Sequence, residues 1–341
     1  MFSLFLTSIE LINRMPRSSA RKDLTLKALE LFQICARKSS VQATADETGL
    51  SISTVSHHLR SLEEHLGVEL FDHARRPMML TPKGQMFLKE IDVALGSIRK
   101  ATAEASAGNV TETSYLRFGS IADMDSDITP DLAVYLSKKM PQCNFVFRSG
   151  SSRELLDMLR DRQLDIGIAT TPPEGVNNLQ DTPLLRDPFV VVLPEGRTEE
   201  TADVMAGKSD LPFLQFTSDL LIARQIEAQL RRLGVEMPDR FECGNNQTLM
   251  AMVAAGAGWT ITTPLLFSRA RRFHSKIRMH QFPGKSFART LSLITTPDCA
   301  GSVRGLIDQK LRKLLTRHAL TPMHQSNAWL EDRFFLVTGA D

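Results

Sequence analysis

Cysteine and long apolar runs are both scarce in this sequence. The 341 residues include 4 cysteines, which lie far apart, without a CxxC pair or a histidine at ligand spacing: Cys35, Cys143, Cys243 and Cys299. That spacing predicts reduced thiols and argues against a disulfide framework or a metal site. No apolar run is long enough to span a bilayer, and the opening MFSLFLTSIELI lacks a basic region and a small-residue cleavage site. We therefore expect a cytoplasmic protein that makes no contact with membranes.

An excess of charge of either sign is missing too. Lys and Arg total 41 and Asp and Glu total 39, a formal net charge of +2, which excludes a chain-wide basic field that binds nucleic acids indiscriminately. Any contact with DNA must therefore be local. With 42% hydrophobic and 23% charged residues, the composition is that of a globular protein, and the length suggests two or three folded units.

Catalytic motifs are also lacking. The sequence contains no nucleophile elbow, no metal-ligand cluster and no phosphate-binding loop between a strand and a helix. We therefore predict that the protein is not an enzyme and has no catalytic residues, no metal and no cofactor.

Two kinds of residue pattern divide the chain. Residues 24–107 carry mostly helical patterns, whereas β-branched runs alternate with helical ones after Gly108 and Asn109, as in YLRFGS, LDIGIAT and PFVVVLP. Such alternation is typical of parallel α/β architecture. The tail after His318 has no clear assignment.

The stretch GLSISTVSHHLRSLEEHLG, residues 49–67, predicts the second helix of a helix-turn-helix. At about 100° per residue, one narrow arc carries the apolar residues Val55, Leu59, Leu62 and Leu66. The other side carries Ser53, Thr54, Ser56, His57 and Arg60. Upstream, Ser40 and Ser51 can cap two helices, and Gly49 allows the left-handed turn between them. In a helix-turn-helix the second helix lies in the DNA major groove.

Two interpretations of that polar side are open. Hydroxyl groups bind phosphates or base edges and Arg can bind guanine through two hydrogen bonds, but a merely solvated helix surface has a similar composition. The next segment, GVELFDHARRPMMLTPKG, favours DNA because it predicts a wing, with short extended pieces at 68–71 and 78–80 around a basic tip. Basic side chains there can enter the minor groove, although adjacent arginines are usually only surface residues. The candidate DNA contacts are Ser51, Ser53, Thr54, Ser56, His57, Arg60, Arg75 and Arg76.

A long helix is predicted to follow the wing. Thr81 is expected to cap it and Pro82 to occupy its first position. Apolar residues recur along it at intervals of three and four, including Phe87, Ile91, Leu95 and Ile98. Because such an apolar stripe needs a partner, we expect these four residues to pair with a second copy of the helix.

The segment from ALELFQ to TPKG, residues 28–84, resembles the N-terminal signature of LysR-type transcriptional regulators. The matching residues are Ser40, Ala45, Ser51, Val55, Ser56, Leu59, Leu62, Glu63, Leu66, Gly67, Leu70, Phe71, Leu80, Thr81 and Gly84. The later α/β part resembles the effector-binding domain of the same family, and the whole resemblance covers roughly residues 24–318. Two departures lie near the expected DNA contact: Ile52–Ser53, where the family usually has Gln and then often Pro or Ser, and His57, where it usually has Arg. An atypical target sequence is the expected consequence.

The resemblance implies a multidomain α and α/β fold. We expect a disordered extension at 1–23, a winged helix-turn-helix at 24–83, a linker and dimerisation helix at 84–108, an effector-binding domain at 109–318 and a tail at 319–341. The effector-binding domain would have the two lobes of the periplasmic-binding-protein type, lobe I about 115–185 and 286–318 and lobe II about 186–285. The family further implies a homodimer or homotetramer that binds promoter double-stranded DNA in the cytoplasm, associated with the nucleoid, contacts RNA polymerase, and responds to a small-molecule effector between the lobes.

Polar residues just after the predicted strands are the candidate effector site, because such sheets bind ligands at the carboxyl ends of their strands. They are Ser120, Asp123, Thr170, Thr171, Thr217, Ser218, Asn245, Asn246, Gln247 and Thr248. Hydroxyl and amide groups at helix starts suit a small polar or anionic ligand held by backbone N–H groups. The same residue types are routine helix caps, so for each residue the two roles carry about equal weight.

Other features allow more than one interpretation. RARRFHSKIR, residues 269–278, could attract an acidic partner but is more often a solvated surface run. A lone cysteine such as Cys243 is more often a core residue than a redox sensor, and the chain lacks the closely spaced cysteine pair of the peroxide-sensing branch of the family.

A transport binding protein is excluded by the winged helix and the missing signal peptide. A regulator controlled by its abundance or by a protein partner, without a ligand, stays open.

Overall fold

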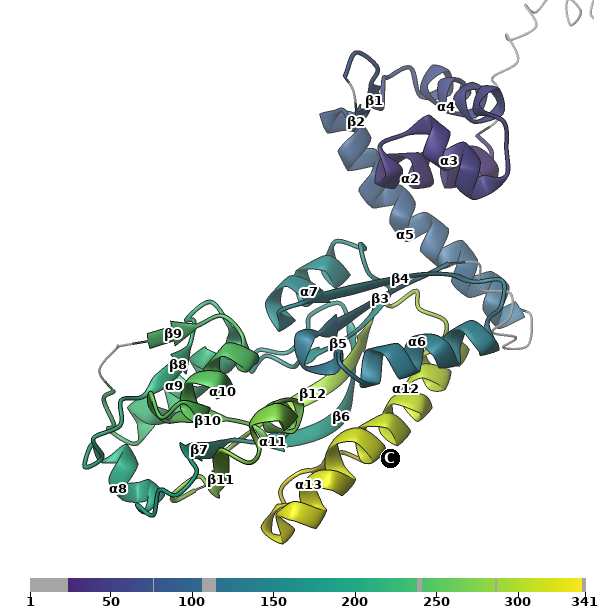
Figure 1. Cartoon of the computed structure of the whole chain (residues 1–341). Helices are drawn as coiled ribbons and strands as arrows, with labels where there is room; N and C mark the ends of the chain where they lie inside the picture. The colour runs from purple at the N-terminus through teal and green to yellow at the C-terminus, as the bar shows by residue number, and fades with distance from the viewer. Residues whose placement is uncertain (1–23, 76, 106–114, 238–240, 286, 339–341) are drawn as a thin grey trace, which may run out of the picture. The chain divides into compact units, whose positions relative to one another are not determined.

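The computed structural model describes residues 24–75, 77–105, 115–237, 241–285 and 287–338. The chain divides into two compact units, with the boundary between Leu95 and Gly96. Mostly helical elements build the first unit, and mixed helices and strands build the second (Figure 1).

The first unit is a winged helix-turn-helix. It contains α2 (Leu26–Lys38), α3 (Val41–Thr48), α4 (Ile52–Leu66), the antiparallel strands β1 (Phe71–Asp72) and β2 (Met79–Leu80), and the start of α5 (Pro82–Ala105). Ser40 and Ser51 cap α3 and α4 as predicted, because each side chain accepts a hydrogen bond from a backbone N–H in the first turn. Gly49 ends α3 in the left-handed conformation, at a φ of 68°. The predicted tight turn between the two helices is confirmed.

The helix α4 is held in the first unit by the burial of its apolar side. Val55, Leu59 and Leu62 are buried in a core that they share with Leu31 and Phe32 of α2. One buried side chain per turn, on one side only, leaves the opposite side of α4 to solvent.

The apolar stripe of α5 has partners within its own unit. Ile91 is 7% exposed and Leu95 is 2% exposed, and both belong to the same core as α2 and α4. Phe87 is half-buried and its ring lies 5.3 Å from that of Phe32. Ile91 and Leu95 therefore do not need a second copy of the helix, which corrects the expectation for these two residues, whereas for Phe87 it stays a prediction. Ile98 differs, since 43% of it is exposed.

The second unit consists of two lobes. Lobe I has a six-stranded sheet with the order β13-β6-β12-β5-β3-β4. Its strands are β3 (Tyr115–Ile121), β4 (Asn144–Gly150), β5 (Ile166–Thr170), β6 (Gln180–Pro188), β12 (Ala288–Thr295) and β13 (Phe335–Leu336). The helix α7 (Ser152–Arg160) covers one face of this sheet, and α6 (Ile128–Lys139) and α12 (Gly301–Leu315) pack together over the other (Figure 1).

Lobe II has smaller sheets. One holds β10 (Thr260–Thr262), β7 (Val190–Pro194) and β11 (Ile277–Gln281), and another holds β8 (Leu214–Phe216) and β9 (Phe241–Cys243). Its helices are α8 (Thr201–Met205), α9 (Leu221–Arg232), α10 (Asn246–Ala254) and α11 (Pro264–Arg269), with the short 3-10 turn η3 (Arg271–Phe273).

The sheets are mixed, which corrects the expectation of a parallel architecture. The strand β3 pairs in parallel with β4 and β5, but β12 pairs antiparallel with both β5 and β6, and β7 pairs antiparallel with β10 and β11. The antiparallel pairs arise because β6 continues into β7 of lobe II and β11 returns to β12 of lobe I. Two chain crossings thus join the lobes.

An aromatic cluster lies where the chain crosses between the lobes. The rings of Phe189 and Phe287 stack at 4.1 Å between centroids, and Phe282 contacts Phe287 edge-on at 4.9 Å. The backbone N–H of Phe189 also donates to the carbonyl of Phe287, at 2.9 Å. Aromatic packing and a hydrogen bond therefore hold the two crossings side by side.

The end of the chain is folded onto the second unit. After α12 come a π-helical turn, η4 (Thr316–Leu320), the helix α13 (Thr321–Ser326), the 3-10 turn η5 (Ala328–Leu330) and β13. Leu330 and Phe334 are fully buried. Within the described residues, no helix combines the length and hydropathy that crossing a membrane requires.

Candidate functional sites

The polar side of α4 is open to solvent. Ser53, His57 and Arg60 are exposed, and Thr54 and Ser56 are half-buried. Ile52, at the start of the same side, is 48% exposed. An exposed large apolar residue beside hydroxyl and basic groups is able to contact a thymine methyl group, whereas the hydroxyl and basic groups suit phosphates and base edges.

The hydroxyl groups at the start of α4 form a small cluster. Ser51 Oγ accepts a hydrogen bond from the backbone N–H of Thr54 at 3.1 Å and lies 2.8 Å from both Ser53 Oγ and Thr54 Oγ1. Ser51 is therefore first a helix cap, as well as an exposed group beside the predicted contact surface.

The wing is attached to α4 through Glu63. Its Oε1 accepts hydrogen bonds from the backbone N–H groups of Leu70, at 2.7 Å, and Phe71, at 3.1 Å, and its Oε2 lies 3.0 Å from Nε2 of His73. Because one carboxylate binds the start of β1 directly, the position of the wing relative to α4 is fixed. Among the predicted wing contacts, Arg75 is exposed and forms an ion pair with Asp72 at 3.1 Å, whereas Arg76 lies outside the described residues.

A groove runs between the wing, α4 and the start of α3. It has a volume of about 780 Å³, and Ser56 and Arg60 line it together with Ser39, Ser40 and His73. The predicted contacts Ser56 and Arg60 thus share one concave surface with residues that the sequence did not assign to DNA.

A second cavity lies between the lobes, where several strands end. It measures about 410 Å³. Its polar lining comprises Asp123, Ser151, Ser152, Glu154, Thr170, Asn245, Asn246, Gln247, Arg269 and Arg289, and its apolar lining includes Ile121, Phe216, Leu220, Ile222 and Leu266. The lining residues follow the carboxyl ends of β3, β5, β8 and β9, as expected for the crevice of such a sheet.

The cavity separates the predicted effector residues into two groups. Asp123, Thr170, Asn245, Asn246 and Gln247 line it. The others have different surroundings: Ser120, Thr171, Thr217, Ser218 and Thr248. Ser120 is buried and donates to Asp125, the hydroxyl of Thr171 lies 2.7 Å from that of Ser292, and Ser218 lines a separate groove. The position of a residue just after a strand is therefore not enough to predict that it lines the cavity, because neighbouring residues in one loop point in different directions.

Helix N-termini converge on the cavity. The helix α7 begins with a capping box, in which Ser151 Oγ accepts from the N–H of Glu154 and Glu154 accepts from the N–H of Ser151 at 2.8 Å. The helix α10 begins at the cap Asn245, and α9 begins after Leu220, without a side-chain cap. The partial positive charge of each N-terminus and its first N–H groups favour an anion in the cavity. Ser151 and Glu154 were not among the predicted site residues, although their Ser-x-x-Glu spacing is the sequence signal of a capping box.

Thr170 brings a further polar group to the cavity. Only 2% of the residue is exposed, and its backbone N–H donates to Ser152 Oγ at 3.0 Å. Within the described part of the chain its hydroxyl has no hydrogen-bond partner, so a ligand in the cavity can supply one.

Two buried arginines complete the lining, and neither was predicted as a ligand contact. Arg289 Nε lies 2.9 Å from Asp187, which is fully buried, and its Nη2 lies 2.9 Å from Asp123. Burial acts to lower the pKa of Arg289, but the two carboxylates outweigh it and hold the pKa above its ordinary value. Asp187 also accepts from the backbone N–H of Leu265, so this pair links the crossing strands to the start of α11.

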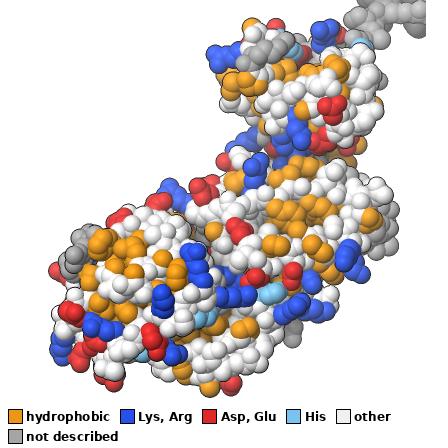
Figure 2. All heavy atoms as spheres, in the orientation of Figure 1, with side chains coloured by type: hydrophobic (Ala, Val, Ile, Leu, Met, Phe, Trp, Pro, Cys, Tyr) orange, Lys and Arg blue, Asp and Glu red, His pale blue; other side chains and the backbone are white. Residues whose placement is uncertain are grey.

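Arg269 is the exception in RARRFHSKIR, whose basic residues Arg271, Arg272, Lys276 and Arg278 are exposed as predicted for a solvated run. Its side chain is only 5% exposed and forms an ion pair with Asp127 of lobe I, and Arg271 contacts the same carboxylate at 2.9 Å. Burial lowers the pKa of Arg269, and the charge of Asp127 opposes this effect. Figure 2 shows basic and acidic side chains beside a histidine where the lobes meet.

Three of the four thiols are poorly suited to redox chemistry. Cys35, Cys143 and Cys243 are buried, which confirms the core interpretation of Cys243. Burial raises the pKa of each, that of Cys143 to about 12. Since the thiolate is the reactive form, these groups are disfavoured as nucleophiles at neutral pH.

Known protein families match both parts of the chain. The family model of the LysR substrate binding domain matches residues 111–309, and that of the bacterial regulatory helix-turn-helix protein, lysR family, matches residues 26–85. The chain therefore belongs to the LysR family of DNA-binding transcriptional regulators, with a substrate-binding domain as its C-terminal part.

Individual relatives are distant. YfeR, an uncharacterized HTH-type transcriptional regulator of Shigella flexneri, is 25% identical over 249 residues, which cover 71% of this chain and 79% of the relative. The transcriptional dual regulator GltC of Bacillus subtilis is 22% identical over 275 residues, 80% of this chain and 90% of GltC. A probable hydrogen peroxide-inducible genes activator of Mycobacterium xenopi is 29% identical over 188 residues, 55% of this chain and 96% of that protein.

Solved structures share the fold. A full-length OxyR variant from Pseudomonas aeruginosa superposes with a TM-score of 0.66 at 21% identity, covering 87% of this chain and 98% of that chain. Full-length CbnR, complexed with its target DNA, superposes with a TM-score of 0.52 at 16% identity, covering 85% and 99%. At these identities the likeness shows a common fold.

Proposed function

We propose that the exposed side of α4 reads the operator in the major groove while the wing contacts the adjacent backbone. The observation that carries this proposal is the division of α4, whose apolar residues are buried and whose Ser53, His57 and Arg60 are exposed. Glu63 fixes the wing beside this helix, so both contacts reach the duplex in one register. Ile52 and His57 differ from the usual family residues, and the operator should differ accordingly.

The active form is a homodimer or homotetramer. Two recognition helices then occupy successive major grooves of an imperfect palindrome, about 34 Å apart. Since Ile91 and Leu95 are buried in their own unit and Phe87 is half-buried there, Ile98 and the exposed part of α5 are the residues left for a helix-to-helix contact. At target promoters the bound regulator contacts RNA polymerase.

The cavity between the lobes binds a small anionic effector. Converging helix N-termini and the hydroxyl of Thr170 support this ligand class. Arg269 and Arg289 already have carboxylate partners, and Asp123 and Glu154 also line the cavity, so the anion is recognised by N–H and hydroxyl groups. Peroxide control, as in the names of some relatives, finds no support in the buried thiols.

Thermal unfolding of the full chain with panels of anionic, neutral and cationic metabolites tests the ligand class. Anions are expected to raise the midpoint, since a ligand of the native state stabilises it by mass action. A shift with cations only would contradict the proposal. If no compound shifts the midpoint, the alternative of a regulator controlled by abundance or a protein partner is favoured.

Footprinting tests the function as a whole. DNA fragments selected from a random pool by the protein give the operator, and DNase I footprints with and without the stabilising anion then show the response. We expect the protected region to change length or phase when the anion binds. Identical footprints would contradict effector control.

A further inference from the structure

The residues after α12 contact both lobes of the second unit. We call residues 316–338, which form η4, α13, η5 and β13, the C-terminal strap. In lobe I, β13 pairs with β6, Val337 N donates to the carbonyl of Leu184 at 2.9 Å, and Arg186 donates to the carbonyl of Arg333 at 2.5 Å. In lobe II, η4 and α13 pack against α11. The match to the LysR substrate binding domain ends at residue 309, before the strap begins.

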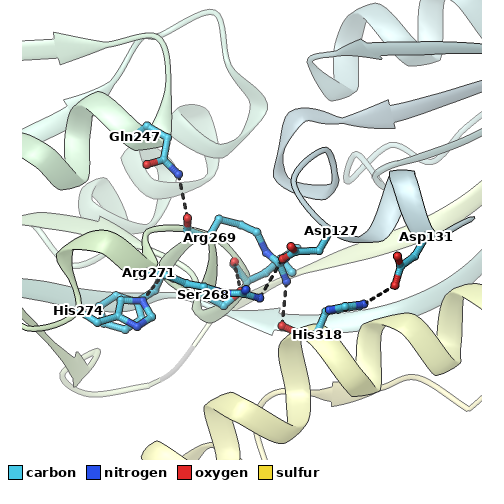
Figure 3. A network of polar contacts seen from close by, with 10 residues as sticks. Asp127, Asp131, Gln247, Ser268, Arg269, Arg271, His274 and His318 are labelled. Carbon is cyan, nitrogen blue, oxygen red and sulfur yellow. Dashed lines mark hydrogen bonds and ion pairs between the residues drawn. The ribbon is translucent and has the colours of Figure 1, made fainter. Parts of the chain in front are cut away.

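Arg269 joins the strap to the effector cavity. It lines the cavity, and its Nη2 donates to the carbonyl of His318 in the strap at 3.0 Å (Figure 3). The other terminal nitrogen binds Asp127 of lobe I. His318 in turn lies 2.9 Å from Asp131 on α6, so the start of the strap is held from both lobes. One guanidinium group therefore contacts the cavity, lobe I and the strap.

This junction also contains unsatisfied polar atoms. Within the described residues, Arg269 Nε and Asn246 Oδ1 are buried without a hydrogen-bond partner. Both side chains line the cavity, and the neighbouring Gln247 donates to the carbonyl of Arg269 at 2.9 Å. A buried polar atom without a protein partner can bind a ligand or a water molecule, so these two atoms are further groups that a ligand in the cavity can contact.

The rest of the strap is firmly anchored. Leu330 and Phe334 are fully buried, and Met323 and Leu320 are nearly so. His324 bonds the carbonyl of Phe334 at 2.8 Å, which closes the strap on itself. The strap is thus held by buried apolar side chains along most of its length and by polar contacts at its start, around His318.

We propose that the C-terminal strap sets the separation of the two lobes and that Arg269 couples the filling of the cavity to the strap. The second half of this proposal rests on the cavity being the effector site, and the first half does not. When an anion fills the cavity, the Arg269 side chain shifts, its bond to the His318 carbonyl changes, and the strap adjusts the angle between lobe I and lobe II.

Hydrogen exchange of the full chain, measured by mass spectrometry, tests the first half. Val337→Pro removes the donor that binds Leu184, and Val337→Ala is the matched control because it keeps that N–H. The proline variant should exchange about fivefold faster in β6 and also in α11 and in residues 244–247 of lobe II. Faster exchange confined to β13 and β6 would overturn the strap as an interlobe link.

Inorganic phosphate is the probe for the second half. Phosphate should slow exchange both in residues 151–154 at the cavity and in η4 of the strap. Arg269→Lys keeps the positive charge but loses the second terminal nitrogen, which donates to the carbonyl of His318. In this variant phosphate should slow exchange at the cavity but not in η4. Arg271→Lys is the control. Protection of η4 that persists in Arg269→Lys would overturn the coupling. If phosphate slows exchange neither at the cavity nor in η4, both the coupling through Arg269 and the anionic effector are contradicted. The comparison of Val337→Pro with Val337→Ala would still show whether the strap links the two lobes.

Discussion

The two candidate sites place their charged residues in opposite environments. On α4, Arg60 is exposed, and the residues that hold the helix are different from those offered to DNA. In the cavity between the lobes, Arg289 is 4% exposed, and the same side chain lines the cavity and contacts both Asp187 of lobe I and Thr263 of lobe II. Substitution of an exposed residue of α4 such as Arg60 should thus change binding alone, whereas a substitution in the cavity should change binding and folding together.

Arg289→Ala should produce the largest effect. It leaves the fully buried Asp187 without its cation, and breaking a buried ion pair from one side costs about 3 to 5 kcal/mol. Urea unfolding followed by circular dichroism measures the loss. The control Arg278→Ala removes an arginine whose side chain is 65% exposed, and it should change stability little. Equal stabilities of the two variants would contradict the structural role of Arg289.

Glu63→Ala should destabilise the first unit by about 1 to 3 kcal/mol, because the N–H groups of Leu70 and Phe71 lose their acceptor. DNA affinity should fall as well, since the wing is no longer held beside α4. Unfolding and fluorescence anisotropy with the selected operator measure the two effects. The neighbouring exposed Glu64→Ala serves as the control. An unchanged DNA affinity of Glu63→Ala would show that the position of the wing beside α4 does not contribute to DNA binding.

Arg60→Ala should weaken operator binding about tenfold, the loss of one good side-chain contact, without a change in stability. Titration by anisotropy at fixed salt measures the affinity, and a thermal melt checks the fold. Arg232→Ala, an exposed substitution on α9, is the matched control. An Arg60→Ala protein that binds normally would show that this side of α4 meets only solvent.

Ser151→Ala should have the smallest effect, about 1 kcal/mol, the usual loss for a removed helix cap. It also removes one hydroxyl from the cavity, so the midpoint shift caused by an anion should shrink. Thermal melts with and without phosphate measure both quantities. Ser137→Ala, on α6, lies outside the residues that line the cavity and should leave the phosphate shift intact.

The helix-turn-helix that carries the candidate DNA contacts was largely predictable because its determinants are local. The caps Ser40 and Ser51, the turn at Gly49 and the apolar spacing from Val55 to Leu62 act within a few residues, and each had its predicted role. The apolar stripe of α5 was different. Its periodicity indicates that the stripe packs against another surface, but it does not show whether that surface is a second copy of the helix or the core of the same unit. The structure assigned Ile91 and Leu95 to the core of their own unit.

The cavity between the lobes was predictable only as a region. Strand ends located Asp123, Thr170 and the start of α10, but not which loop residues point inward. The long strand β6 and the strap also had no local pattern that we recognised. In the strap, isolated apolar residues become buried only because β6 and α12 provide a surface for them.

The sequence by itself determined the elements, the helix-turn-helix and its polar side, because caps, turns and hydrophobic periodicity depend on near neighbours. Tertiary structure alone decided which charges are buried. Asp187 lies 102 residues before Arg289, and Asp127 lies 142 residues before Arg269. No local pattern in the sequence pairs residues so far apart. Folding brings each pair together and removes water from it, so the attraction between the two charges depends on the tertiary structure.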